Sequence, residues 1–223
     1  RRMKIIELAD RYGVPIIEDD PYGQLRFEGD HIPPVVHLDN QYRSNSNGTS
    51  YSGNVIYLST FSKTLSPGLR LAWIIAPPEV IRKLVLAKQG ADLHTATFNQ
   101  VIAFEVAKDG FLDQHIKVIR ETYRERRDVM LDTLVESMPE GVRWTHPEGG
   151  LFLWATMPDN IDSAELLKVA LIEKVAFVPG GPFHPDGRGK NTMRLNFSFC
   201  KPEIINEGIS RLGRVVKTMV KEK

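Results

Sequence analysis

The sequence predicts an α/β protein that combines part of a mostly parallel-sheet large domain with an α+β small domain. Short apolar runs at 14–17, 55–58 and 71–76 alternate with helical periodicity, as in sheets covered by helices. A long amphipathic stretch at 112–138 predicts a helix, and short strand patterns beyond residue 139 are typical of an α+β domain. We therefore expect a large domain over 1–111, a connecting helix over 112–138 and a small domain over 139–223.

The first segment, residues 1–12, has the periodicity of a helix that stops at Gly13. No capping residue or strand precedes it, so we expect the numbered chain to begin inside a larger protein. The run at 14–17 fits a strand buried on both faces and ends in a Pro- and Gly-containing turn at 18–23. Residues 28–54 are polar, with a Ser/Asn-rich run at 44–48, and predict a long surface loop.

Strand direction brings three polar residues together. The link between 55–58 and 71–76 is too short for a helical crossover, so these strands should be antiparallel. If the first two runs are parallel, Asp19 and Lys63 each follow the carboxyl end of a strand, and Arg70 precedes the strand that runs back. All three would then share the sheet edge where open α/β sheets bind ligands.

After the third apolar run, the sequence predicts helices at 79–90 and 98–108, followed by the long helix. Its arginines are interleaved with Glu121 and Glu125, which favours a solvated face over a nucleic-acid patch. Strands are expected at 142–144, 151–154, 175–178 and 193–197. We further expect a helix at 163–174 capped by Ser163 and a last amphipathic helix from Pro202.

Composition excludes several classes of function. The formal net charge is +1, from 29 basic and 28 acidic residues, which gives no broad field for nucleic acid or a membrane surface. No apolar run approaches the length of a membrane span. The single cysteine, Cys200, excludes an internal disulfide, is typical of a small buried hydrophobe and suits the cytoplasm. The six histidines lack metal-ligand spacing, so no metal is expected.

Four segments carry a family resemblance: 18–23 (EDDPYG), 59–70 (STFSKTLSPGLR), 147–154 (PEGGLFLW) and 193–198 (MRLNFS). In order and separation they resemble the class I/II, fold-type I aminotransferases that use pyridoxal 5'-phosphate (PLP). The branch of aminoadipate, kynurenine and aromatic aminotransferases is especially similar. The resemblance covers essentially the whole chain and implies the carboxyl-terminal portion of such an enzyme. The family's amino-terminal phosphate turn, its stacking aromatic ring and its cofactor-binding Asn are not identifiable here.

The resemblance assigns a role to each candidate residue. Lys63 would form the Schiff base with PLP and shuttle the proton. The spacing Asp-x-x-Tyr favours Asp19 over Asp20 as the partner of the pyridine nitrogen, with Tyr22 as donor to the ring oxygen. Thr60, Ser62 and Arg70 would bind the phosphate, although the two hydroxyls could also be plain turn residues. Arg194 would clamp the substrate carboxylate in a bidentate pair that lysine cannot reproduce.

The implied function is transamination between an amino acid and a 2-oxo acid in a homodimer. Two alternatives stay open. Similar domains sense effectors in transcription regulators with a winged-helix domain, and nucleic acid would be a partner only in that case. The other alternative is a PLP-dependent lyase acting on cysteine conjugates.

Overall fold

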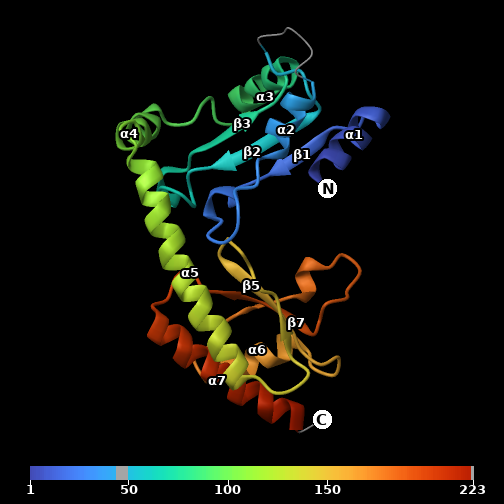
Figure 1. The fold of residues 1–223 in the computed structure, drawn as a ribbon, viewed down its shortest axis with the longest axis vertical. Coiled ribbons are helices and arrows are strands. Elements are labelled where there is room, and N and C mark those ends of the chain that lie inside the picture. The colour runs from blue at the N-terminus through green and yellow to red at the C-terminus, as the bar shows by residue number, and fades with distance from the viewer. Residues whose placement is uncertain (44–49, 222–223) are drawn as a thin grey trace. The chain divides into compact units, whose positions relative to one another are not determined.

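The computed structural model describes residues 1–43 and 50–221, so the expected polar run at 44–48 lies outside the described residues. The chain forms two compact units, Arg1–Ile119 and Arg120–Lys223. Helix α5 (Phe111–Ser137) runs from the first unit into the second (Figure 1). Within the described residues, no helix is both long and apolar enough to cross a membrane.

The first unit contains a three-stranded sheet in the order β1 (Ile16–Asp19), β2 (Val55–Thr60), β3 (Ala72–Ile75). β1 pairs parallel to β2, with Asp19 opposite Leu58. β3 runs back antiparallel to β2, with Ala72 opposite Thr60 (Figure 1). Both predicted strand directions are confirmed, and β1 extends beyond the apolar run to include Asp19.

One face of this sheet carries the core of the first unit. The helix α1 (Arg2–Tyr12), which ends at Gly13 in the left-handed conformation, packs Ile6 against Val55 and Tyr57 of β2. The expectation that β1 is buried on both faces is wrong, because Ile17 is 68% exposed. The reason is the register: Ile16 pairs with Val55 on the covered face, whereas Ile17 points to the opposite face.

The loop predicted at 28–54 contains a helix, α2 (Val35–Tyr42). The Glu18 carboxylate on β1 accepts hydrogen bonds from Val35 N at 2.9 Å and Val36 N at 3.2 Å. It thereby satisfies two free N–H groups at the start of this helix. Such a cap comes from a residue distant in sequence, so no local pattern around residue 35 could have indicated it.

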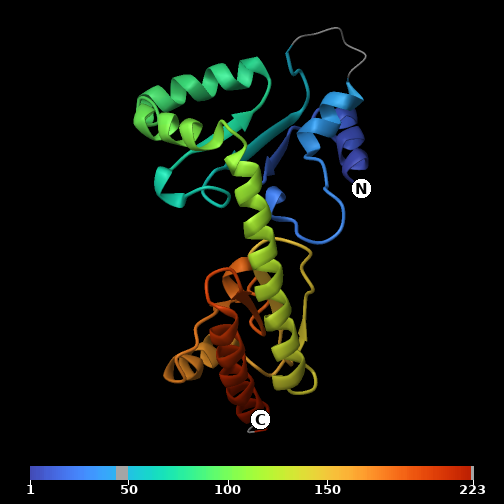
Figure 2. The same ribbon diagram turned by 60° about the vertical axis from the view of Figure 1, so that its left-hand side comes forward.

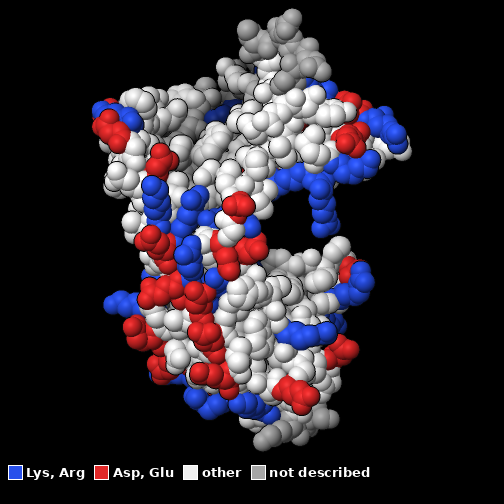
Figure 3. Space-filling model, in the orientation of Figure 1, with Lys and Arg blue, Asp and Glu red and all other residues white. Residues whose placement is uncertain are grey.

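After β3 the chain forms α3 (Pro78–Ala91) and α4 (Thr97–Ala107), shown in green in Figure 2. These two helices and α5 confirm the predicted helical segments. Acidic and basic side chains are interleaved along the course of α5 (Figure 3). The expectation of a purely solvated arginine face is nevertheless wrong at one position, since Arg127 is only 3% exposed.

The second unit contains a four-stranded antiparallel sheet in the order β4 (Arg143–Trp144), β5 (Phe152–Thr156), β7 (Thr192–Asn196), β6 (Val178–Pro179). Leu153 and Ala155 of β5 and Met193 and Leu195 of β7 are almost fully buried. Phe152 and the other alternate residues of these strands lie on the opposite face.

Two expectations about the second unit are wrong in detail. The strand predicted at 175–178 begins only at Val178, because Lys174 adopts a left-handed conformation and Val175 N still bonds Ala170 O after the helix. That helix, α6 (Ser163–Ile172), is capped by Asp162, whose Oδ1 accepts from Ala164 N at 2.8 Å. Ser163 is instead a buried first residue of the helix.

The last helix, α7 (Pro202–Lys221), confirms the predicted amphipathic segment and approaches the end of α5 closely at Gly213. A Cβ atom on Gly213 would lie 2.5 Å from the backbone oxygen of Ser137. A side chain there must push the two helices apart.

We therefore expect Gly213→Ala to destabilise the second unit by about 1–3 kcal/mol through overpacking. Gly208→Ala is the matched control, since a Cβ atom at this second helical glycine would have no neighbour within 4 Å. Alanine there should be neutral or stabilise by up to about 1 kcal/mol. Urea unfolding of both variants checks this, and equal stabilities would contradict the close approach.

Candidate active site

The carboxyl ends of β1 and β2 are tied together by hydrogen bonds. Asp20 N donates to Leu58 O at 2.8 Å, and Ser59 Oγ donates to Asp20 O at 2.8 Å. These bonds hold the turn after β1 beside the end of β2, from which the chain continues to Lys63. Asp19 and Lys63 are thus brought to one edge of the sheet.

The two neighbouring aspartates at this edge have different environments. The Asp20 carboxylate accepts hydrogen bonds from Gly23 N at 2.6 Å and from the Tyr57 hydroxyl at 3.3 Å. Burial raises the pKa of Tyr57, so its phenol stays protonated and continues to donate. Asp19 is exposed and has no side-chain partner among the described residues. Asp20 therefore stabilises the turn, whereas the Asp19 carboxylate is open to a ligand.

Lys63 lies in the middle of a tight turn at 61–66. The Phe61 carbonyl accepts from Thr64 N, Leu65 N and Ser66 N at 3.3, 2.8 and 3.1 Å. Lys63 itself is half-buried, and its Nζ has no hydrogen-bond or ion-pair partner among the described residues. The backbone of the turn is thus fixed while the amine remains available.

Two hydroxyls stand beside this turn. Thr60 Oγ1 donates to Leu71 O at 2.7 Å and accepts from Ser62 N at 3.0 Å. Thr60 Oγ1 and Ser62 Oγ lie 2.9 Å apart. These bonds engage Thr60 within the turn, as a plain turn residue would be, and place the Ser62 hydroxyl next to it.

Arg70 follows the short 3-10 helix η2 (Pro67–Leu69) and has a φ of 53°, in the left-handed region. A residue with a side chain adopts this conformation at a cost of about 1–2 kcal/mol. The cost is offset by surrounding bonds: Asn99 Nδ2 of α4 donates to Leu69 O at 3.1 Å, and Arg70 NH1 donates to Pro67 O at 3.1 Å. The guanidinium is exposed. Strain held in this way is common at binding sites.

Tyr22 lies three residues after Asp19 and directly before the 3-10 helix η1 (Gly23–Leu25). Its carbonyl accepts from Leu25 N at 2.8 Å, which closes the turn. The ring is 36% exposed, so the phenol is accessible at the same strand end.

Arg194 lies in β7 of the second unit, on the open face of its sheet. Its guanidinium carbon is 4.2 Å from the ring centre of Phe152 and 5.1 Å from that of Phe183. Arg194 Nε is buried and lacks a hydrogen-bond partner in the part of the chain that the structure describes. A buried N–H without a partner is costly, and a bound carboxylate would satisfy it.

Sequence reasoning missed the aromatic residues that support Arg194. Phe152 lies on β5 on the same face, as does Trp154, which pairs directly with Arg194. Phe183 belongs to the 3-10 helix η3 (Gly181–Phe183), which begins after a close approach of Gly180 to Thr192. Alternation in β5 could have identified Phe152, but no local pattern places Phe183 near β7.

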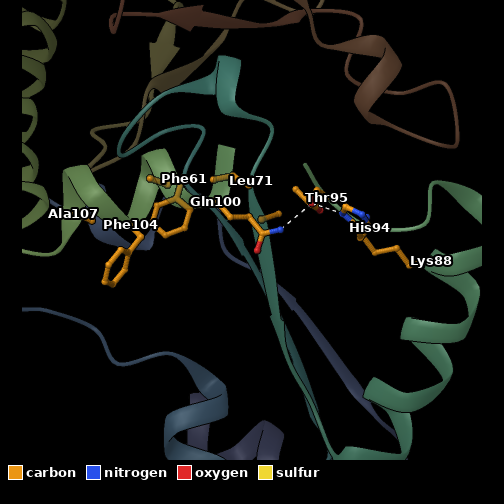
Figure 4. Close-up of a pocket in the computed structure, with 10 residues that line it drawn as sticks. Phe61, Leu71, Lys88, His94, Thr95, Gln100, Phe104 and Ala107 are labelled. Carbon is orange, nitrogen blue, oxygen red and sulfur yellow. Dashed lines mark hydrogen bonds between the residues drawn. The ribbon is translucent and has the colours of Figure 1, made fainter. Parts of the chain in front are cut away.

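A hollow of about 570 Å³ lies beside Phe61, the first residue of the Lys63 turn (Figure 4). Phe61 from the turn and Leu71, directly before β3, line it together with Phe104 and Gln100 of α4. The Gln100 amide donates to Thr95 O at 2.9 Å. Lys63 and Asp19 are not among its lining residues, so the hollow is a neighbouring feature and not the site defined by the strand ends.

The different environments of the two aspartates predict different costs of removal. Asp20→Ala removes the acceptor of two hydrogen bonds and should destabilise the protein by about 1–2 kcal/mol. Asp19→Ala, the matched control, should change stability by less than about 0.5 kcal/mol. Thermal unfolding without added ligand measures both, and a larger loss for Asp19→Ala would show that its carboxylate has a structural partner.

Residues 3–212 match the model of the family described as aminotransferase class I and II. Among curated proteins, the chain is 48% identical over 222 residues to aromatic-amino-acid aminotransferase 1 of Thermococcus litoralis, covering 100% of this chain and 51% of that protein. It is 31% identical to the uncharacterized HTH-type transcriptional regulator YisV of Bacillus subtilis, covering 99% of this chain and 43% of that protein. The chain thus spans about half the length of the curated relatives it matches.

Among solved structures, the chain is similar to the α-aminoadipate aminotransferase of Thermus thermophilus, complexed with N-(5'-phosphopyridoxyl)-L-leucine. The TM-score is 0.92 at 41% identity, and the match covers 100% of this chain and 55% of that chain. The fold predicted from the sequence, that of the fold-type I transferases, is confirmed. The family match over nearly all of its residues shows that the chain belongs to the class I and II aminotransferases.

Proposed function

We propose that the protein is a PLP-dependent aminotransferase that moves an amino group between an amino acid and a 2-oxo acid. One observation carries the proposal. The amine of Lys63 and the carboxylate of Asp19 lie at the same end of two parallel, paired strands, and neither has a partner among the described residues. Family membership and the 48% identity to an aromatic-amino-acid aminotransferase support it.

The residues at this edge fit PLP chemically. The cofactor has an aldehyde, a ring nitrogen, a ring hydroxyl and a phosphate, which call for an amine, a carboxylate, a phenol and a cluster of hydroxyl and guanidinium donors. Lys63 supplies the amine, Asp19 the carboxylate and Tyr22 the phenol. Ser62, Arg70 and Thr60 supply the donors, with Thr60 the weakest candidate because its hydroxyl already bonds Leu71 O. When bound, PLP supplies the electron sink that stabilises the carbanion at the substrate α-carbon.

The environments of the side chains support a role for each of them. Lys63 Nζ would hold the cofactor and would take the α-proton of the substrate and return it during transfer. The open carboxylate of Asp19 keeps the ring nitrogen protonated, because a negative partner stabilises the cationic form. Arg194 binds the α-carboxylate, which would also satisfy its unpaired Nε.

A second candidate is the effector-binding domain of a transcription regulator, which the 31% identity to the Bacillus subtilis regulator supports. Such a domain would bind PLP and an amino compound without producing a new amino acid. A PLP-dependent cysteine-conjugate lyase would instead release pyruvate without a 2-oxo acid acceptor. Product analysis therefore separates the three functions, and the higher identity to named aminotransferases favours transamination.

We also propose that the enzyme is a homodimer of the cytoplasm. Large apolar side chains stay exposed on α4, with Phe98 at 75% and Phe104 at 64% exposure. Exposed apolar groups of this kind are typical of surfaces that a protein partner covers. The single cysteine suits a reducing compartment.

Lys63→Ala should abolish the visible absorbance band of bound PLP and lower transamination by at least about a thousandfold, because covalent attachment and proton transfer are lost together. Lys83→Ala, which removes an exposed lysine of α3, is the matched control and should keep both. Borohydride reduction and peptide mass spectrometry should place the cofactor on Lys63. A band that persists in Lys63→Ala, or a label on another lysine, would overturn the assignment. Retention of the band without amino transfer in the unsubstituted protein would favour the regulator.

A further inference from the structure

We infer that Arg126 and Arg127 are positioning residues that hold the carboxylate-binding Arg194 in place through the chain segments next to β5 and β7. The inference rests on the proposed role of Arg194 in substrate binding and goes beyond it. It concerns two consecutive residues in the middle of α5, in the segment that the sequence indicated to be a solvated face.

Arg127 is buried, with an exposure of 3%. Its NH1 donates to Pro147 O at 2.8 Å and lies 3.4 Å from His146 Nδ1. Its Nε is 2.7 Å from Asp128 Oδ1, so the charge is partly balanced on the helix itself. A buried guanidinium is costly to desolvate unless polar partners compensate it, and the Pro147 carbonyl is such a partner here. This carbonyl belongs to the backbone of the segment that leads into β5.

Arg126 is half-buried and reaches a different segment. Its NH1 donates to the carbonyl of Ser198, just after β7. The Ser198 backbone N–H in turn donates to Asn196 Oδ1 at 2.7 Å. Neighbouring residues of a helix point about 100° apart, so the two arginines can hold two separate segments at once.

Both segments lie at the same end of the β5–β7 pair. Phe152, the first residue of β5, pairs with Asn196, the last residue of β7. Phe197 N donates to Leu151 O at 3.2 Å and closes this end. The two arginines therefore attach α5 to the end of the strand pair that carries Phe152 and Arg194.

The consequence concerns the geometry of the guanidinium. Arg194 is two residues from Asn196, and its guanidinium carbon lies 4.2 Å from the Phe152 ring centre. A shift of β5 against β7 would change this contact and the direction in which Arg194 presents its N–H groups. A bidentate pair with a carboxylate tolerates little misorientation. Loss of either anchor should thus weaken binding of every substrate that carries an α-carboxylate, with little effect on the cofactor.

The test uses the full-length protein reconstituted with PLP, with enzyme concentration taken from the cofactor absorbance. Arg127→Lys and the milder Arg126→Lys keep the positive charge but remove the planar set of N–H donors of the guanidinium. Each should raise KM for the amino acid and the 2-oxo acid by a similar factor, about tenfold, with kcat changed less than about twofold. Arg124→Lys, at an exposed position of the same helix, is the matched control and should leave KM unchanged.

A double-mutant cycle with Arg194→Lys separates positioning from general stability. If the two arginines act through Arg194, adding either substitution to Arg194→Lys should raise KM by less than about twofold further. Full additivity, an unchanged KM, or a fall in kcat alone would overturn the inference. If Arg194→Lys itself left KM unchanged, the proposed substrate role of Arg194 would fail instead. Failure of the Lys63 assignment would show separately in the absorbance band.

Discussion

The parallel pairing of β1 with β2 is the constraint on which the candidate site depends. It sets Asp19 opposite Leu58, so the residues that follow each strand emerge at one edge of the sheet. The Asp20 backbone then bonds both Leu58 and Ser59, which locks the turn after β1 to the end of β2. With that edge fixed, a carboxylate and an amine from separate parts of the sequence come to the same end of the two strands, and neither has a hydrogen-bond or ion-pair partner among the described residues. A shift of one residue in this pairing would move Asp19 to the opposite face of the sheet.

At the sheet edge, residues with structural roles lie next to residues that are open to a ligand. Asp20 caps the turn and leaves Asp19 open, and the bonded backbone of 61–66 leaves the Lys63 amine available. Arg127 is buried against the chain leading into β5, whereas Arg194 keeps an unpaired Nε. At the sheet edge, hydrogen-bonded polar groups thus hold in place a neighbouring side chain that has no partner among the described residues. This arrangement is expected of a preorganised site, because side chains that are already held in place lose little conformational entropy when a ligand binds.

Much of the fold and most of the candidate site followed from the sequence. Continuous apolar runs indicated the strands, and the short link before Leu71 predicted that β3 runs back against β2. What the sequence did not reveal depends on contacts between distant residues. The first N–H groups of α2 are capped by Glu18. Arg127 donates to the carbonyl of Pro147, twenty residues further along the chain. Phe183 contacts Arg194 from a different segment. The exposure of Ile17 belongs with these cases, because burial of a strand face depends on which helices cover it.

We propose that this sheet edge holds one PLP molecule between Lys63 and Asp19. A crystal structure of the full-length protein grown with PLP tests it most directly. We expect continuous electron density from Lys63 Nζ to the aldehyde carbon of the cofactor, with an Asp19 carboxylate oxygen within hydrogen-bond distance of the ring nitrogen. Density joined to another lysine, or a ring nitrogen facing Asp20, would contradict it.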